Sequence, residues 1–110
     1  MRITVFGATG QVGKRIVRQA LALGHQVTAF GRNVDSLIDA DIRNDNLLAV
    51  KGYVFDAGDV FNAVKNAEAV ISALGGAIDG ADKTRSLGMK NIVEQMQQSG
   101  VQRLMVVASM

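Results

Sequence analysis

The sequence MRITVFGATGQVG, at residues 1–13, decides the fold. Its first six residues form a mostly apolar run typical of a strand, and Gly7, Gly10 and Gly13 follow at regular spacing. Glycine lets the chain turn sharply at Gly7, lets a ligand approach the backbone at Gly10, and lets the next helix pack closely at Gly13. The first helical N–H groups would then point at a diphosphate, where the positive end of the helix dipole favours negative charge.

The remaining chain supplies the context that this turn needs. A glycine triplet alone is a weak signal, and a tight turn with only a structural role is the alternative. Helical patterns at 11–23, 57–66 and 84–99, with a short helix expected at 34–38, separate apolar strand patterns at 1–6, 26–30, 47–51, 69–74 and 102–108. Helices that join successive strands make right-handed crossovers in a parallel sheet. We therefore predict one doubly wound α/β domain over residues 1–110, a Rossmann fold with strand order 3-2-1-4-5.

Two finer expectations concern the helices. Asp56 is predicted to cap the helix at 57–66, with Asp59 in the capping-box position. The helix at 84–99 is expected to bury four apolar side chains against the sheet: Leu87, Ile92, Val93 and Met96.

Composition excludes several classes of function. The 110 residues are 48% hydrophobic and 20% charged, which is ordinary for a globular domain. A net charge of +2, with the basic residues scattered along the chain, gives no indication of nucleic-acid or membrane-surface binding. No apolar run reaches the roughly 18 residues of a membrane span, and the N-terminus does not resemble a secretory signal. The absence of cysteine and the single histidine argue against a metal site and fit a cytoplasmic location.

The residues after the second predicted strand bear on the choice of nucleotide. An acidic residue there would bind the ribose 2′-hydroxyl of NAD, whereas an arginine suits the 2′-phosphate of NADP. The sequence has Arg32 in this place and no carboxylate before Asp35. The guanidinium is a permanently charged donor fork that matches phosphate. This favours NADP(H) over NAD(H), with a solvated cation as the alternative.

Several stretches together resemble the atypical short-chain dehydrogenase/reductase group. They are GATGQVG at 7–13, GRN at 31–33, AVISALG at 69–75, KNIV at 90–93 and GVQRL at 100–104. Within that group the chain is most similar to the NAD(P)H-binding family of flavin reductase and biliverdin-IXβ reductase type, with NmrA-like redox-sensing regulators as more distant relatives. The resemblance covers essentially the whole chain.

The resemblance implies a role for particular residues. The pyrophosphate would be held at the glycine turn, by Gly7, Thr9, Gly10, Gln11, Val12 and Gly13. Arg32 would bind the 2′-phosphate, Leu74 and Gly75 would lie beside the nicotinamide-side ribose, and Ser109 would lie near the nicotinamide and substrate. A serine at the end of the sequence, with no part in chemistry, is the alternative for Ser109. The Tyr-x-x-x-Lys pair of typical short-chain dehydrogenases is missing, since Tyr53 is the only tyrosine.

The sequence departs from the family in two places. The family usually has Gly-Asp-Val after the third strand, where the aspartate helps to hold adenine, but this chain has Gly52, Tyr53 and Val54. A tyrosine could stack on adenine or merely shield the sheet edge. Family members are also usually longer, so a sixth strand and most of the substrate pocket are expected to be missing. The fifth strand would then be an apolar edge, for which we expect self-association, or else the chain is a fragment.

Three functions follow, in decreasing order of support. The first is an NADPH-dependent reductase of flavin or a related conjugated acceptor, or its coenzyme-binding portion, in which the coenzyme supplies the hydride. The second is an NADP(H)-binding or sensing module without turnover. The third is a structural role without any nucleotide.

Overall fold

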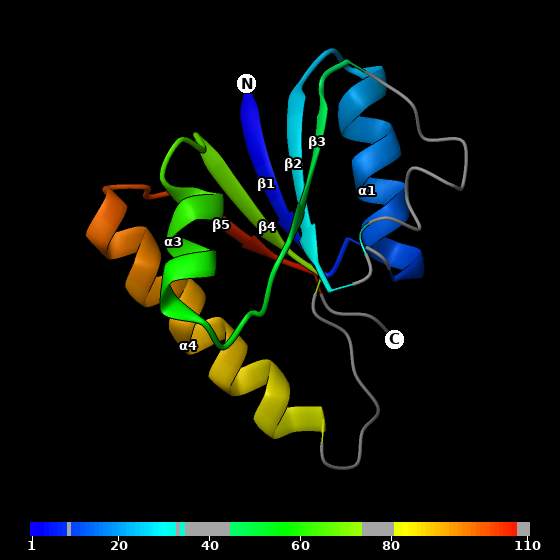
Figure 1. Cartoon of the computed structure of the whole chain (residues 1–110). Helices are drawn as coiled ribbons and strands as arrows, with labels where there is room; N and C mark the ends of the chain where they lie inside the picture. Colours follow the sequence, from blue (N-terminus) through cyan, green and yellow to red (C-terminus); the bar gives the residue numbers. More distant parts are fainter. Residues whose placement is uncertain (9, 33, 35–44, 74–80, 108–110) are drawn as a thin grey trace.

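The computed structural model describes residues 1–8, 10–32, 34, 45–73 and 81–107, with the backbone alone at 81–86. Its elements are labelled in Figure 1 and are β1 (Arg2–Phe6), α1 (Gln11–Ala22), β2 (Gln26–Gly31), β3 (Leu47–Lys51), α3 (Ala57–Val64), β4 (Ala69–Ser72), α4 (Ala81–Ser99) and β5 (Leu104–Val106). The short helix predicted at 34–38 lies outside the described residues.

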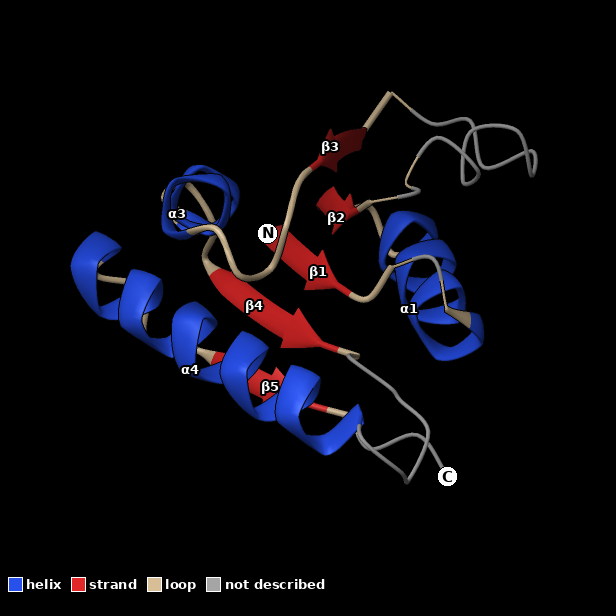
Figure 2. Cartoon of the chain, turned by 60° about the horizontal axis from the view of Figure 1, so that its bottom comes forward, coloured by secondary structure: helices blue, strands red, loops and turns tan. Residues whose placement is uncertain are grey.

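The strands form one parallel sheet in the order β3-β2-β1-β4-β5, which confirms the predicted doubly wound arrangement. Helix α1 lies on one face of the sheet, and α3 and α4 lie on the other (Figure 2). The register pairs Phe6 with Phe30 on one side and with Ser72 on the other. The carboxyl ends of β1, β2 and β4 are therefore level at one edge of the sheet.

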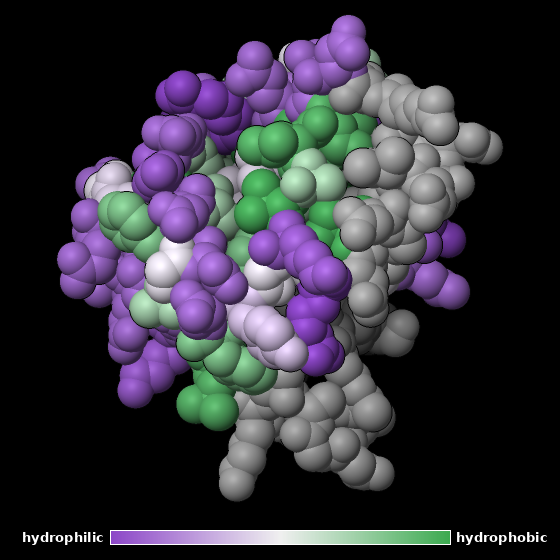
Figure 3. Space-filling view, viewed as in Figure 1, coloured by the Kyte–Doolittle hydropathy of each residue, from purple (hydrophilic) through white to green (hydrophobic). Residues whose placement is uncertain are grey.

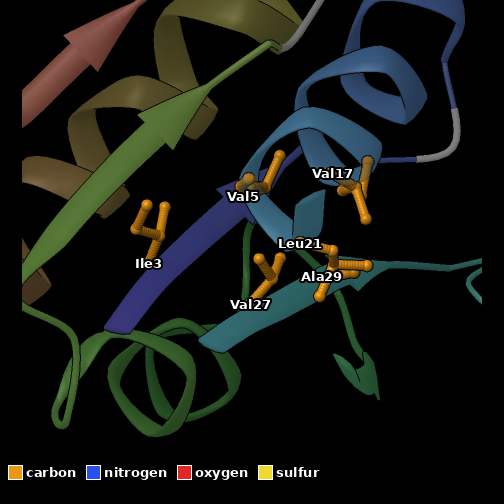
Figure 4. Packing of buried hydrophobic residues seen from close by; sticks show 8 residues of the cluster. Ile3, Val5, Val17, Leu21, Val27 and Ala29 are labelled. Atoms are coloured by element: carbon orange, nitrogen blue, oxygen red, sulfur yellow. The ribbon is translucent and has the colours of Figure 1, made fainter. Parts of the chain in front are cut away.

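The core on the α1 face is made of aliphatic side chains. Val5 of β1 and Val27 of β2 pack with Val17 and Leu21 of α1 (Figure 4), and all four are buried. In β1 and β2 the buried residues of this cluster recur at two-residue spacing, as Val27 and Ala29 do, and in α1 Val17 and Leu21 are four residues apart, so each element presents one apolar face.

The core on the opposite face is centred on two aromatic rings. Phe6 and Phe30 are almost completely buried, with their ring centroids 5.0 Å apart and their planes at 54°. Val60 and Val64 of α3 and Ile92 of α4 belong to the same cluster. Because Phe6 and Phe30 are the last core residues of β1 and β2, this aromatic pair lies directly beneath the ends of those strands.

Helix α4 differs from the expectation in two respects. It begins at Ala81, three residues before the predicted start. Ile92 and Met96 are buried as predicted, but the prediction was wrong for Leu87, which is 55% exposed, and for Val93, which is 38% exposed. Ile92 and Met96, four residues apart, belong to the core cluster that α4 shares with α3 and the sheet, whereas Leu87 and Val93 lie outside this cluster.

The strand ends also differ slightly from prediction. β4 ends at Ser72 and β5 extends only over Leu104–Val106. The glycines that follow α1 and α4 have left-handed backbones, with φ of 87° at Gly24 and 80° at Gly100, which favours glycine at these helix ends. Of the expected apolar edge, Met105 is 62% and Val106 58% exposed, so β5 presents apolar side chains to solvent.

Candidate functional site

The glycine turn joins β1 to α1 at the carboxyl edge of the sheet. Gly7 has a φ of 73°, which favours glycine, and its carbonyl oxygen accepts a hydrogen bond from the Gly10 N–H at 3.2 Å. A Cβ added to Gly13 would overlap the Gly7 carbonyl oxygen and lie 2.8 Å from the Ala8 Cα. Conformation at Gly7 and packing at Gly13 therefore require glycine within the protein itself, as the spacing predicts.

Gly10 is different, because neither its backbone conformation nor a contact with the described residues requires glycine there. Its φ is −73° and ψ is 168°, an ordinary extended conformation. A Cβ would meet only the Gly7 carbonyl oxygen, at 3.6 Å, which is a normal van der Waals distance. The residue is also exposed. Glycine is also favoured at an N-cap, and here it leaves open space in front of the turn, which a ligand could use for close approach to the backbone.

The start of α1 has free hydrogen-bonding capacity beside this space. Gly10 is the N-cap and provides no side-chain cap, and the first turn contains no acidic residue. The first helical N–H groups have no acceptor within a helix, so a helix start without a cap offers them to solvent or to a ligand. Together with the helix dipole, these N–H groups form a site that suits an anion such as a diphosphate.

A second group of residues follows β2 and β3. The two strands end side by side, since Gly31 pairs with Lys51, and the Gly52 N–H donates to the Gly31 carbonyl oxygen at 3.3 Å. The guanidinium carbon of Arg32 lies over the ring of Tyr53, 5.4 Å from its centroid. Both side chains are exposed, Tyr53 by 55%. This is a cation–π contact at the surface, next to the ends of the strands.

The chain around Tyr53 is fixed by hydrogen bonds. The Tyr53 N–H donates to Asp59 Oδ2 at 3.1 Å, and the Tyr53 carbonyl oxygen accepts from the Asp56 N–H at 3.0 Å. Asp56 caps α3 as predicted, accepting from the Asp59 N–H at 2.9 Å. Asp59 is in the capping-box position as predicted, because its N–H donates to Asp56. Its carboxylate does not complete the box: the Asp56 N–H donates to the Tyr53 carbonyl oxygen, and Asp59 Oδ2 accepts from the Tyr53 N–H instead.

Asn91 of α4 is a contributor that the sequence did not reveal. Its Nδ2 donates to the Val54 carbonyl oxygen at 2.8 Å, and its Oδ1 accepts from Gln95 Nε2 at 3.1 Å. The Val54 side chain packs against the aromatic core, so its backbone is held from both sides. Asn91 lies in the KNIV stretch, but only the folded chain shows that α4 comes close to the segment after β3.

The structure thus brings together two sets of predicted residues. Gly7, Gly10, Gln11, Val12 and Gly13 form the glycine turn. Arg32, Tyr53 and Val54 lie at the ends of the neighbouring strands, at the same edge of the sheet. Thr9, Leu74, Gly75 and Ser109 lie outside the described residues, so their predicted roles stay predictions.

Other features of the surface lie away from this edge. A cavity of about 570 Å³ is lined by residues of β1, β2 and β3, by the end of α3 and by the segment after it. Its lining includes Arg2, Gln26 and Asn66 and none of the predicted site residues that the structure describes. Apolar surface is exposed over β3 (Figure 3), where Leu48 is 61% exposed. Among the described residues, no cluster of three or more histidine, cysteine or acidic side chains could hold a metal ion.

Comparison with known proteins places this geometry in a family. A family model described as NAD(P)H-binding matches residues 7–110. The chain is 35% identical over 98% of its length to a 3-beta-hydroxysteroid dehydrogenase from Mycolicibacterium neoaurum, and covers 32% of that protein. It is 30% identical over 69% of its length to the phenylcoumaran benzylic ether reductase IRL1 of Ginkgo biloba, covering 27% of that protein.

A solved structure shows the same arrangement of elements. The anaerobillin reductase ChuY from Escherichia coli O157:H7 matches 99% of this chain with a TM-score of 0.77 and 27% identity, and the chain covers 51% of ChuY. The chain therefore spans between 27% and 51% of the length of these three relatives. None of the helices in the described part of the chain is long and apolar enough to cross a membrane.

Proposed function

We propose that this chain, which belongs to the NAD(P)H-binding family, is the coenzyme-binding part of an NADPH-dependent reductase that acts on a flavin or a related conjugated acceptor. The observation that carries the proposal is Gly10. Neither its backbone conformation nor its packing requires glycine, and it lies at the start of a helix that has no side-chain cap. Space in front of free N–H groups is what a diphosphate needs.

We propose a role for each described residue from its position in the fold and from the family resemblance. The turn from Gly7 to Gly13 would receive the pyrophosphate through backbone N–H groups. Arg32 would meet the 2′-phosphate, and the segment of Tyr53 and Val54 would lie beside the adenine. In the proposed site, Leu74, Gly75 and Ser109 would hold the nicotinamide side of the coenzyme.

The coenzyme supplies the hydride, and the protein binds and orients it. Tyr53, the only tyrosine of the chain, lies on the adenine side of the proposed site. No tyrosine of the chain is therefore proposed as a proton donor to the acceptor. Flavins accept a hydride with little assistance from an acid, which is why we propose an acceptor of this kind.

The printed names of the relatives support the oxidoreductase class rather than one substrate. The Ginkgo biloba protein and ChuY are named as reductases, and the Mycolicibacterium neoaurum protein is named as a dehydrogenase. Fold and family alone do not fix an acceptor, because one coenzyme-binding fold serves many substrates.

Calorimetric titration with NADPH, followed by an assay of NADPH oxidation in the presence of FMN, tests the proposal. Saturable NADPH binding with oxidation supports the reductase. Tight binding without oxidation of NADPH by FMN or another conjugated acceptor would instead support the second candidate function, an NADP(H)-binding or sensing module. Absence of binding by either coenzyme to the folded chain would overturn both.

A further inference from the structure

Arg32 and Tyr53 form a pair whose chemistry differs from that of an ordinary surface arginine. The structure records no ion pair between Arg32 and any described carboxylate, and places its guanidinium over the Tyr53 ring. A contact with the face of a ring uses the charge of the cation but occupies none of its N–H groups with an acceptor. The donor fork of Arg32 therefore stays available for a ligand.

Tyr53 is well suited to hold Arg32 because its own backbone cannot easily move. Its N–H is bonded to the Asp59 carboxylate and its carbonyl oxygen to the Asp56 N–H. The preceding Gly52 lies against the aromatic core, where a Cβ would come within 2.7 Å of the Phe30 ring. The ring is thus presented from a fixed segment, whereas the Arg32 side chain is long and exposed.

We propose that Tyr53 is a positioning residue for coenzyme choice: it holds Arg32 at the ends of β2 and β3, paired with none of the described carboxylates, so that the guanidinium meets the 2′-phosphate of NADP(H). This rests on the proposed function. A carboxylate in place of the Tyr53 ring would pair with Arg32 and compete with the phosphate for its donors. The aromatic ring attracts the cation without competing in this way.

Binding measurements with variants test the proposal. Calorimetry gives the affinities of NADP⁺ and NAD⁺ for the wild type, Arg32→Ala, Tyr53→Phe, Tyr53→Leu, Tyr53→Asp and the double variant Arg32→Ala/Tyr53→Leu. Phe55→Leu is the matched control, because Phe55 is an equally exposed aromatic residue, at 51%, in the same segment. Thermal melts check that each variant folds.

The expected readout is the ratio of the two affinities. Tyr53→Leu should lower the preference for NADP⁺ about two- to fivefold, the range that an exposed cation–π contact supports, and Tyr53→Asp should lower it further. Tyr53→Phe and Phe55→Leu should keep the wild-type ratio. In the Arg32→Ala background, Tyr53→Leu should have no additional effect on the ratio. If Tyr53→Leu weakens both coenzymes equally, Tyr53 only contacts adenine and the proposal is overturned.

A second measurement needs no coenzyme. Tyr53 is the only tyrosine and the chain has no tryptophan, so its emission reports this ring alone. A cation over the ring attracts iodide, so Arg32→Ala should reduce quenching by iodide relative to quenching by neutral acrylamide. An unchanged quenching ratio would overturn the pairing while leaving the proposed function intact. Failure of the wild type to bind either coenzyme would overturn the proposed function and, with it, the role in coenzyme choice, even if quenching shows the pair.

Discussion

In the first turn, Gly13 is required by packing within the protein, whereas Gly10 leaves space for the proposed ligand. Alanine substitutions should separate these two roles, one through stability and the other through coenzyme affinity. In Gly13→Ala, the new methyl group would overlap the Gly7 carbonyl oxygen and approach the Ala8 Cα to 2.8 Å. Both neighbours are backbone in a tight turn, so they cannot swing away as a side chain would. Forcing an extra methyl into packed surroundings costs about 1–3 kcal/mol or more. For a domain of this size, each kcal/mol lowers Tm by about 4–8 °C.

Gly10→Ala should behave in the opposite way. The methyl would meet nothing closer than 3.6 Å, and φ is already negative. Alanine is a poorer N-cap than glycine, but it also reduces the entropy of the unfolded chain, and these effects of about 0.5–1 kcal/mol oppose each other. Stability should stay within about 1 kcal/mol of the wild type. The methyl would, however, occupy the space proposed for the diphosphate, and an overlap of about 1–3 kcal/mol lowers affinity about 5- to 150-fold.

Urea unfolding and calorimetric titration with NADPH measure the two quantities on the same proteins. The wild type should gain about 2.7 kcal/mol of stability at a coenzyme concentration a hundred times Kd, whereas Gly10→Ala at the same concentration should gain much less. The reasoning fails if Gly10→Ala binds NADPH as tightly as the wild type. It fails equally if Gly13→Ala is as stable as the wild type, because the close approach at Gly13 would then carry no cost.

Three further predictions follow from single contacts. Asn91→Ala removes the hydrogen bond to the Val54 carbonyl oxygen, so urea unfolding should show a loss of about 0.5–1.5 kcal/mol of stability, and calorimetry should show weaker NADPH binding. The control Gln97→Ala, at an exposed position of α4, should change neither the stability nor the affinity. Thr4→Val removes a buried 2.7 Å hydrogen bond to the Ala63 carbonyl oxygen and should lower the free energy of unfolding by about 1–3 kcal/mol. Ser72→Ala should lower it little, because Ser72 Oγ is buried without a hydrogen-bond partner in the described structure. Equal losses of stability in the two variants would contradict this prediction. The 110-residue chain should self-associate through the β5 edge in light scattering, and Met105→Lys should reduce this; a wild type that stays monomeric at high concentration would refute it.

The sequence predicted the topology because hydrophobic periodicity is a local property. Apolar residues at two-residue spacing in strands and at three- to four-residue spacing in helices are visible in the sequence itself. The alternation of strands and helices then predicts a doubly wound parallel sheet, and the glycine turn after the first strand favours the order 3-2-1-4-5. The turn at Gly7 and the packing at Gly13 were predicted for the same reason, since both depend on neighbours a few residues away.

Contacts between distant segments could not be predicted in this way. The hydrogen bond from Asn91 to Val54 joins α4 to the segment after β3, and no local pattern in either stretch indicates that the two are in contact. The spacing placed Asp59 in the capping-box position, but the bond from the Asp56 N–H to the Asp59 carboxylate is absent because the Asp56 N–H donates to the Tyr53 carbonyl oxygen instead. Leu87 and Val93 matched the helical period, but which positions of α4 are buried depends on how the helix packs against α3 and the sheet.

The aromatic pair beneath the strand ends explains how these separate segments come to form one site. Phe6 is followed directly by Gly7, and Phe30 is followed by Gly31 and Arg32. Gly52 approaches the same Phe30 ring so closely that a Cβ there would come within 2.7 Å of it, and this fixes the start of the segment that carries Tyr53. The glycine turn, the arginine and the tyrosine are thus positioned against a single pair of buried rings 5.0 Å apart. This packed core layer would hold these backbones in place before the proposed coenzyme binds, so we expect little of the binding free energy to be spent on ordering them.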